Sequence, residues 1–170
     1  KLEMEGSLKD DLQNGKWIYW RAHGNKEAEG YYKNDKQDSL WQYWYTKGAL
    51  WKKGLYKDGK KNGWWEFYYS PKELVGISNP DQHRGQNGQR MEAGKFIDDK
   101  QDSLWTAWYE NGQKRDEGIF KKGFMDGKWT GWHDNGNKNY DGFYADSVKT
   151  GEWQYWFKDG KLYQKGVYNN

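Results

Sequence analysis

The stretch GKWTGWHDNGNKNYDGFY, from Gly127 to Tyr144, contains the pattern from which the fold of this chain can be predicted. An aromatic-rich run is followed by Asn135-Gly136 and then by a polar run that ends in a glycine and two aromatic residues. Asn-Gly between two strand-like runs is a strong signal for a β-hairpin, because both central residues of a type I′ turn need positive φ. We therefore predict two antiparallel strands joined by a type I′ turn at Asn135-Gly136.

The aromatic and glycine positions of this stretch recur every 24 residues, apart from one step of 40 residues that includes a 16-residue insertion. The first tryptophan column consists of Trp17, Trp41, Trp65, Trp105, Trp129 and Trp153. The second aromatic column, three residues later, consists of Trp20, Trp44, Tyr68, Trp108, Trp132 and Trp156. The glycine column consists of Gly6, Gly30, Gly54, Gly94, Gly118, Gly142 and Gly166. Several columns in one register indicate a tandem repeat.

These repeats predict an all-β fold, an elongated single-layer antiparallel meander of 24-residue β-hairpins that forms one array over residues 1–170. A turn-like segment such as residues 57–63 joins each unit to the next, so that each unit contributes two strands. Hydrophobic residues make up 34% of the chain and aromatic residues 19%, so rings must supply the core of a thin structure. We expect the glycine column to make room for an indole from a neighbouring strand.

The charge and composition of the chain exclude several classes of function. The net charge of +3 comes from 28 basic and 25 acidic residues without a basic run, so we expect neither nucleic-acid binding nor strong membrane binding. Cysteine is absent and no apolar run approaches the roughly 20 residues of a membrane span. The sequence begins at Lys1, partway through a repeat, which leaves the compartment open, with the cytoplasm favoured over the cell envelope.

No catalytic motif stands out in the sequence. His23, His83 and His133 occupy different positions within their repeats, so they form no column of metal ligands. Nucleophile elbows, phosphate-binding glycine loops and HExxH are missing. We expect no enzymatic activity, no cofactor and no metal.

The stretches Gly127–Tyr144 and Trp105–Phe120 resemble the variant MORN repeat (membrane occupation and recognition nexus), which is found widely in bacteria. Its pattern is roughly G-x-W-x-x-W-Y-x-N-G-x-K-x-x-E-G-x-Y, with His133 here in place of the tyrosine and Asp141 in place of the glutamate. The resemblance covers the chain apart from residues 70–85, and it implies a twisted sheet of β-hairpins. It also implies a kinship with YwqK-type antitoxin-like proteins.

Two columns that vary between repeats share a face with the first tryptophan column, because side chains alternate along a strand. We call this the aromatic face. The Tyr19 column consists of Tyr19, Tyr43, Phe67, Ala107, Gly131 and Tyr155. The Arg21 column consists of Arg21, Tyr45, Tyr69, Tyr109, His133 and Phe157. Because tryptophan, tyrosine and arginine dominate interface hot spots, we predict that the Arg21 column contacts a partner.

The insertion at residues 70–85 (SPKELVGISNPDQHRG) is the second candidate site, and it lies within the third repeat, the one led by Trp65. Loops on rigid scaffolds often carry function, although hairpin tips also tolerate neutral insertions. From this loop we add Lys72, Glu73, His83 and Arg84 to the predicted partner-binding residues.

These observations favour a non-catalytic scaffold that binds another protein, a toxin or an assembly partner. The family resemblance narrows this to an antitoxin or immunity protein. Two alternatives remain at this point, a glycan-binding or cell-envelope repeat protein and a membrane- or phosphoinositide-associated scaffold.

Overall fold

The computed structural model describes residues 3–71 and 88–169, which contain β-strands and no helix. The chain divides into two compact units, unit 1 (Lys1–Gln89) and unit 2 (Arg90–Asn170). The strands of unit 1 are β1 (Glu3–Lys9), β2 (Leu12–Trp20), β3 (Lys26–Lys33), β4 (Lys36–Trp44), β5 (Leu50–Lys57) and β6 (Lys60–Tyr68). The strands of unit 2 are β7 (Arg90–Ile97), β8 (Lys100–Trp108), β9 (Lys114–Lys121), β10 (Phe124–Trp132), β11 (Lys138–Ala145), β12 (Val148–Trp156) and β13 (Leu162–Tyr168).

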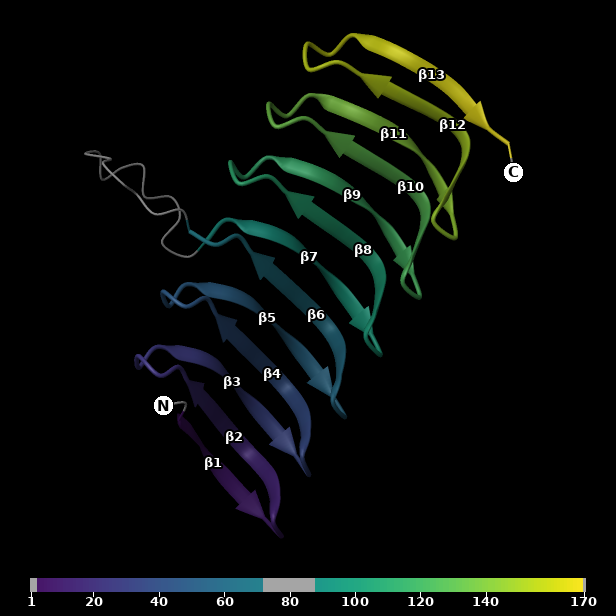
Figure 1. Ribbon diagram of the computed structural model, residues 1–170. Helices are drawn as coiled ribbons and strands as arrows, with labels where there is room; N and C mark the ends of the chain where they lie inside the picture. Colours follow the sequence, from purple (N-terminus) through teal and green to yellow (C-terminus); the bar gives the residue numbers. More distant parts are fainter. Residues whose placement is uncertain (1–2, 72–87, 170) are drawn as a thin grey trace, which may run out of the picture. The chain divides into compact units, whose positions relative to one another are not determined.

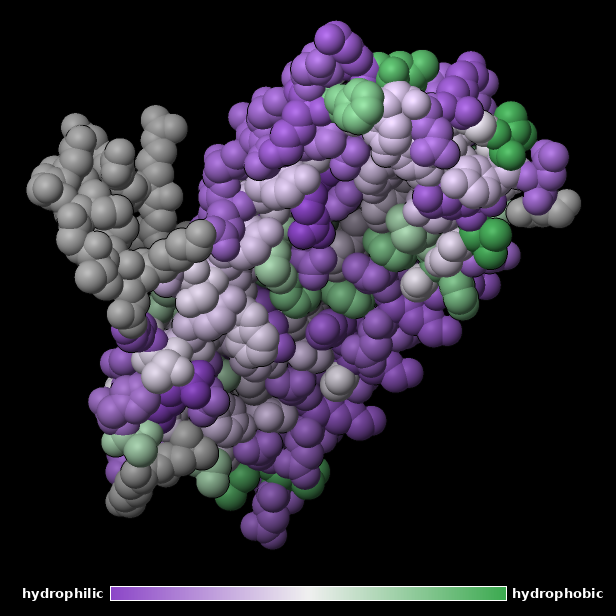
Figure 2. Space-filling model, turned by 45° about the horizontal axis from the view of Figure 1, so that its top comes forward, coloured by the Kyte–Doolittle hydropathy of each residue, from purple (hydrophilic) through white to green (hydrophobic). Residues whose placement is uncertain are grey.

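Within each unit, every strand pairs antiparallel with the strand that follows it in the sequence (Figure 1). The paired strands are joined by short turns, and each unit is one layer of β-hairpins. The predicted all-β, single-layer antiparallel meander is therefore confirmed in both units. Strongly hydrophobic residues form only isolated green groups among pale and purple ones in Figure 2, as a ring-based core would leave them.

Two kinds of turn alternate along the chain, and one of them differs from the prediction. At Asn135-Gly136 only the glycine has positive φ, 87°. Gly136 donates its N–H to the carbonyl of His133, and the N–H of His133 donates to Asn137, which leaves three residues in the loop. This is a type I turn followed by a left-handed residue, so the predicted type I′ turn was wrong.

The type I′ geometry belongs instead to the turns that join one hairpin to the next. Asp98 and Asp99, between β7 and β8, have φ of 47° and 67°. Asp146 and Ser147, between β11 and β12, have φ of 48° and 68°. Aspartate tolerates left-handed backbone better than most residues, so two-residue loops form here without glycine.

The core of each unit is a lattice of indoles lying on glycines. Trp41, Trp65, Trp105 and Trp153 are at most 3% exposed, and each lies over a glycine that precedes it by 11 residues. A Cβ on any of these glycines would overlap the indole, which confirms that the glycine column makes room for the tryptophan. The glycine–tryptophan pairs are Gly6–Trp17, Gly30–Trp41, Gly54–Trp65, Gly94–Trp105, Gly118–Trp129 and Gly142–Trp153.

Each of these indoles is fixed by a hydrogen bond and by rings that meet it edge-on. The Nε1–H of Trp129 donates to the carbonyl of Ile119, the residue after Gly118, over 3.1 Å. The ring of Phe120 lies edge-on to Trp129 at 5.1 Å between centroids and to Trp105 at 6.0 Å. T-shaped pairs at these separations are favourable. The repeated columns therefore act as scaffold.

Candidate functional site

The Tyr19 column lies on the aromatic face, as its spacing predicts. Tyr43 stacks on Trp41 with centroids 5.8 Å apart, and Phe67 stacks on Trp65 at 5.9 Å. Tyr155 covers Trp153 in the same way at 5.8 Å. In these repeats a variable ring covers the indole of the scaffold.

A hollow of about 260 Å³ opens on the aromatic face of unit 2, where this column changes character. At Ala107 and Gly131 the chain carries small residues in place of the ring that the other copies have. The lining includes the indoles of Trp105 and Trp129, together with Glu92, Asp116 and Tyr140. The hollow thus has aromatic and acidic walls, supplied by strands β7 to β11.

Asp116 organises the polar side of this hollow. Its Oδ2 lies 2.6 Å from Nε of Arg115, and its Oδ1 accepts a hydrogen bond of 2.7 Å from the hydroxyl of Tyr140. Burial, reinforced by the hydrogen bond to Asp116, raises the pKa of Tyr140 well above its ordinary value of 10.0. Tyr140 therefore remains a neutral hydrogen-bond donor, and its ring lies against Gly131 and stacks on Trp153.

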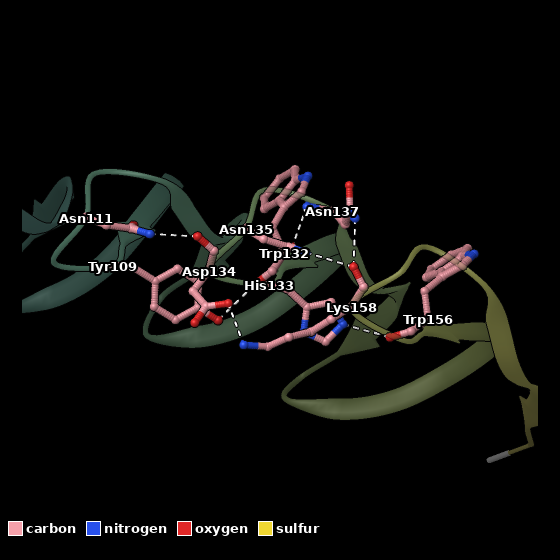
Figure 3. Close-up of polar contacts among 9 residues, drawn as sticks. All are labelled: Tyr109, Asn111, Trp132, His133, Asp134, Asn135, Asn137, Trp156 and Lys158. Carbon is pink, nitrogen blue, oxygen red and sulfur yellow. Dashed lines mark hydrogen bonds and ion pairs between the residues drawn. The ribbon is translucent and has the colours of Figure 1, made fainter.

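The Arg21 column joins each repeat to the next one. The hydroxyl of Tyr109 donates to the carbonyl of Trp132 over 2.9 Å, and Nε2 of His133 lies 2.8 Å from the carbonyl of Trp156 (Figure 3). Unit 1 repeats the arrangement, since Arg21 donates to the carbonyl of Trp44 and Tyr45 to that of Tyr68. These four predicted residues thus have a structural role, and their contact with a partner stays a prediction.

The other two members of the column are placed differently. The side chain of Phe157, in the last repeat, has no hydrogen-bond donor; the residue is 55% exposed, and its ring packs on Tyr163 at 4.6 Å between centroids. Tyr69 lies just after β6, where its backbone N–H donates to the carbonyl of Gln89 over 2.9 Å. Lys72, Glu73, His83 and Arg84 lie outside the described residues, as does residue range 72–85 of the insertion, so their predicted role stays a prediction.

Asparagines of the hairpin turns add a second set of links between repeats, which sequence reasoning missed. Nδ2 of Asn111 donates to the carbonyl of Asp134, and Asn135 and Asn137 both donate to the carbonyl of Lys158 (Figure 3). The Lys158 ammonium in turn lies 2.6 Å from the Asp134 carboxylate. The recurrence of asparagine in these turns was the signal available in the sequence.

Sequence reasoning also missed the residues that enter the aromatic face from the strand after each turn. The register shift at the end of β4 leaves Trp51 beside Tyr43 and Tyr45, and Tyr163 takes the same place beside Tyr155 in unit 2. Applying the 24-residue interval to these positions would have shown that they vary as much as the Arg21 column. This bulge column consists of Glu27, Trp51, Met91, Arg115, Asn139 and Tyr163.

The opposite face carries the second aromatic column and paired charges. The ammonium of Lys26 lies over Trp20 and Trp44 and forms a 2.6 Å ion pair with Glu29. Lys53 and Glu66 form another pair at 2.8 Å. Charged side chains here are thus largely engaged within the protein.

Neither a metal centre nor a membrane-spanning helix is found in residues 3–71 and 88–169. No group of three or more histidine or acidic side chains is arranged to hold a metal ion in this part of the chain. Likewise, the described residues contain no helix of the length and hydropathy that a membrane crossing needs.

Comparison with known families identifies three tandem repeats in unit 2. Residues 101–122, 125–146 and 149–170 match the MORN repeat variant. A comparison of the chain with curated protein sequences found no significant match. The match indicates a repeat scaffold or a binding role, and such all-β repeat scaffolds are typically not enzymes.

Proposed function

We propose that this protein is a non-catalytic scaffold that binds another protein through its aromatic face. The observation that carries the proposal is that exposed, variable rings stand on a fixed ring lattice. Trp51, Phe157 and Tyr163 are 39%, 55% and 50% exposed, and each contacts another ring of this face. Aromatic side chains of this kind supply most of the energy at protein interfaces.

The lattice beneath these rings favours binding because it limits their freedom before a partner arrives. Ordering a side chain on association costs about 0.5–1.5 kcal/mol, and a ring that is already packed loses less. Trp51 is held by Tyr43 and Tyr45, and Tyr163 is held by Tyr155 and Phe157. The constant columns keep the face rigid, while the variable columns give it specificity.

The experiment compares capture of partner proteins by two matched sets of variants. The first set, Trp51→Ser, Phe157→Ser and Tyr163→Ser, removes exposed rings from the aromatic face. The control set, Leu104→Ser, Phe143→Ser and Val167→Ser, removes side chains of the opposite face that are 52%, 47% and 64% exposed. We expect the first set to lose at least nine tenths of the captured partner and the control set to keep it, with circular dichroism unchanged in both. Equal capture by the two sets would remove the proposal.

A narrower form of this function is an antitoxin or immunity protein, which covers the working surface of a toxin. Its support is the resemblance of the repeats to the antitoxin-like group, together with a rigid face suited to occlusion. Co-expression with a toxin encoded beside this gene tests it directly. Protection that is lost with the aromatic-face variants supports the antitoxin role, and toxicity unchanged by the wild-type protein excludes it.

Glycan binding is the second candidate, since exposed ring pairs also stack on sugars. Phe157 and Tyr163, with centroids 4.6 Å apart, form such a pair at the end of unit 2. Titration of the protein with a panel of glycans, followed by tryptophan fluorescence, separates the candidates. A saturable response to one sugar class favours this reading, whereas a flat response leaves the protein-binding scaffold.

A further inference from the structure

We propose that the hollow of unit 2, lined by Glu92, Trp105, Ala107, Asp116, Trp129 and Tyr140, binds the alkylammonium group of a lysine side chain that belongs to a protein partner. The inference rests on the proposed function, which it makes specific. It commits to a lysine on a folded or flexible partner and not to a free amine.

The chain itself shows how lysines lie on the aromatic face elsewhere. Nζ of Lys149 lies 4.4 Å from the ring centroid of Trp153, and that of Lys61 lies 5.0 Å from Trp65. Nζ of Lys52 likewise lies 4.5 Å from Tyr43 and 4.2 Å from Trp51. An ammonium within about 6 Å of a ring centroid is attracted by the ring quadrupole. Ammonium groups are thus a natural complement of this face.

The hollow has the same aromatic floor without those lysines. The position four residues before the tryptophan holds Lys61 and Lys149 in their repeats, but Gln101 and Met125 at the hollow. The position two residues before the glycine, held by Lys52 in unit 1, holds Glu92 and Asp116 here. Neutral and acidic residues therefore stand where other repeats place their own cations.

The charge of the hollow completes this complementarity. Its ionisable lining residues are Glu92, Arg115 and Asp116 (Tyr140 stays neutral), so the lining supplies two carboxylates and one guanidinium. The Arg115 guanidinium forms a 2.6 Å ion pair with Asp116. A second cation is favoured beside such a cluster, because the aromatic walls reduce its screening by water.

Size selects a single side chain as the occupant. The volume of about 260 Å³ lies below the roughly 300–1,000 Å³ of pockets that take drug-sized ligands. The space lies beside Ala107, which lacks the ring found at this position in four other repeats, Tyr19, Tyr43, Phe67 and Tyr155. At Gly131, the other small residue of the column, the ring of Tyr140 occupies the place instead and forms one wall of the hollow. An unbranched four-carbon chain with a terminal ammonium fits such a narrow, aromatic-sided space.

The test titrates the full chain with Nα-acetyl-lysine methylamide. The control probe is Nα-acetyl-norleucine methylamide, which keeps the four-carbon side chain and lacks the ammonium. Indole N–H signals in nuclear magnetic resonance spectra report the binding. We expect saturable shifts of the Trp105 and Trp129 signals with the lysine probe and at least tenfold weaker binding of the norleucine probe. Equal shifts with both probes would overturn the proposal.

Three variants locate the site. Ala107→Tyr restores the ring of the other repeats and should abolish binding of the lysine probe. Asp116→Asn should weaken it at least threefold. Glu117→Gln is the matched control, because Glu117 precedes Gly118 on the other face and pairs with Lys114 at 2.7 Å. Unchanged binding by Ala107→Tyr, or equal losses in Asp116→Asn and Glu117→Gln, would contradict the assignment.

Partner capture separates this inference from the proposed function. If the wild-type protein captures a partner but does not bind the lysine probe, the lysine site in the hollow is excluded, and the protein-binding scaffold is not. Loss of capture on acetylating the partner's lysines, matched by loss in Ala107→Tyr, supports both. Butylammonium that binds at least tenfold more tightly than the lysine probe, without any captured protein, points to a free amine and overturns the lysine assignment.

Discussion

At the scale of single residues, each glycine of the glycine column and the indole that lies on it depend on each other. The glycine lets the indole lie flat on the backbone, and the indole N–H is then within hydrogen-bond distance of the next carbonyl, as in Trp41 and Tyr31 at 2.9 Å. Glycine is required here by space alone, since φ at Gly30, Gly54 and Gly118 is not positive.

This glycine–tryptophan packing predicts that two glycine-to-alanine substitutions differ in their effect on stability. In Gly118→Ala the new methyl group would overlap the Trp129 indole, and the free energy of unfolding should fall by about 1–3 kcal/mol. Nothing lies within 4 Å of a Cβ at Gly166, so Gly166→Ala should leave stability unchanged or raise it by up to about 1 kcal/mol. Urea unfolding of both variants measures the difference. Similar losses in the two would count against the space argument.

Buried tyrosines predict loss of stability at high pH. Burial, reinforced by the hydrogen bond to Tyr56, raises the pKa of Tyr43 well above 10.0, and burial with Asp116 does the same for Tyr140. The folded protein then holds these protons more tightly than the unfolded chain, so their contribution is complete below pH 10 and decreases as the pH rises through the folded pKa values. As the pH is raised above 10, the absorbance of tyrosinate and the circular dichroism signal should change together. Ionisation of all tyrosines with the fold intact would contradict this.

At the scale of strands and turns, successive hairpins are joined twice, by the strand ladder and by side chains of the loops. Tyr109 and Asn111 of one loop donate to the carbonyls of Trp132 and Asp134 in the next one. These bonds give each of the two backbone carbonyls a side-chain donor from the preceding loop. They also align the loops at one edge of the sheet (Figure 3).

This second link predicts the effect of removing one hydroxyl. Tyr109→Phe keeps the ring but leaves the carbonyl of Trp132 without this donor, and the free energy of unfolding should fall by about 1 kcal/mol. Phe157→Tyr is the reverse change in the last repeat, where no further hairpin lies within the described residues, and should have little effect. Chemical denaturation checks both. An unchanged free energy of unfolding in Tyr109→Phe would mean that the ring, and not the hydroxyl, joins the repeats.

Strands were predictable from sequence because the 24-residue register repeats the same demands in every copy. Turn type was not, since Gly136 invites a type I′ assignment, while the actual type I′ turns include glycine-free pairs such as Asp98-Asp99. The role of the Arg21 column was equally hidden. The register shift that ends strands such as β10 re-aims His133 towards the neighbouring repeat, and a single strand's alternation does not reveal it.

The hollow was only half visible in the sequence. The small residues Ala107 and Gly131 could be seen to interrupt a column of rings. Their neighbours Asp116 and Tyr140 come from the strands paired alongside, Ala107 opposite Asp116 and Gly131 opposite Tyr140. Only the register between strands brings these groups together.

At the scale of the whole molecule, each described strand within a unit pairs only with strands next to it in the sequence. Stability in such an array is a sum of repeat terms and nearest-neighbour terms. Damage should therefore remain local. In Gly118→Ala, amide hydrogen exchange should accelerate in β8 to β11 and stay near wild type in β1 to β4. Uniform acceleration along both units would show instead that the chain opens as one cooperative body.

In our proposal the constant columns form the scaffold and the variable aromatic face binds the partner. Hydroxyl-radical footprinting of the complex with its captured partner tests this most directly, because it reads both faces of the unaltered protein at once. We expect protection of Trp51, Phe157 and Tyr163, while Trp64 and Phe143 on the opposite face, 53% and 47% exposed, should react as in the free protein. Protection of Trp64 and Phe143 with unchanged oxidation of Trp51 and Tyr163 would contradict it.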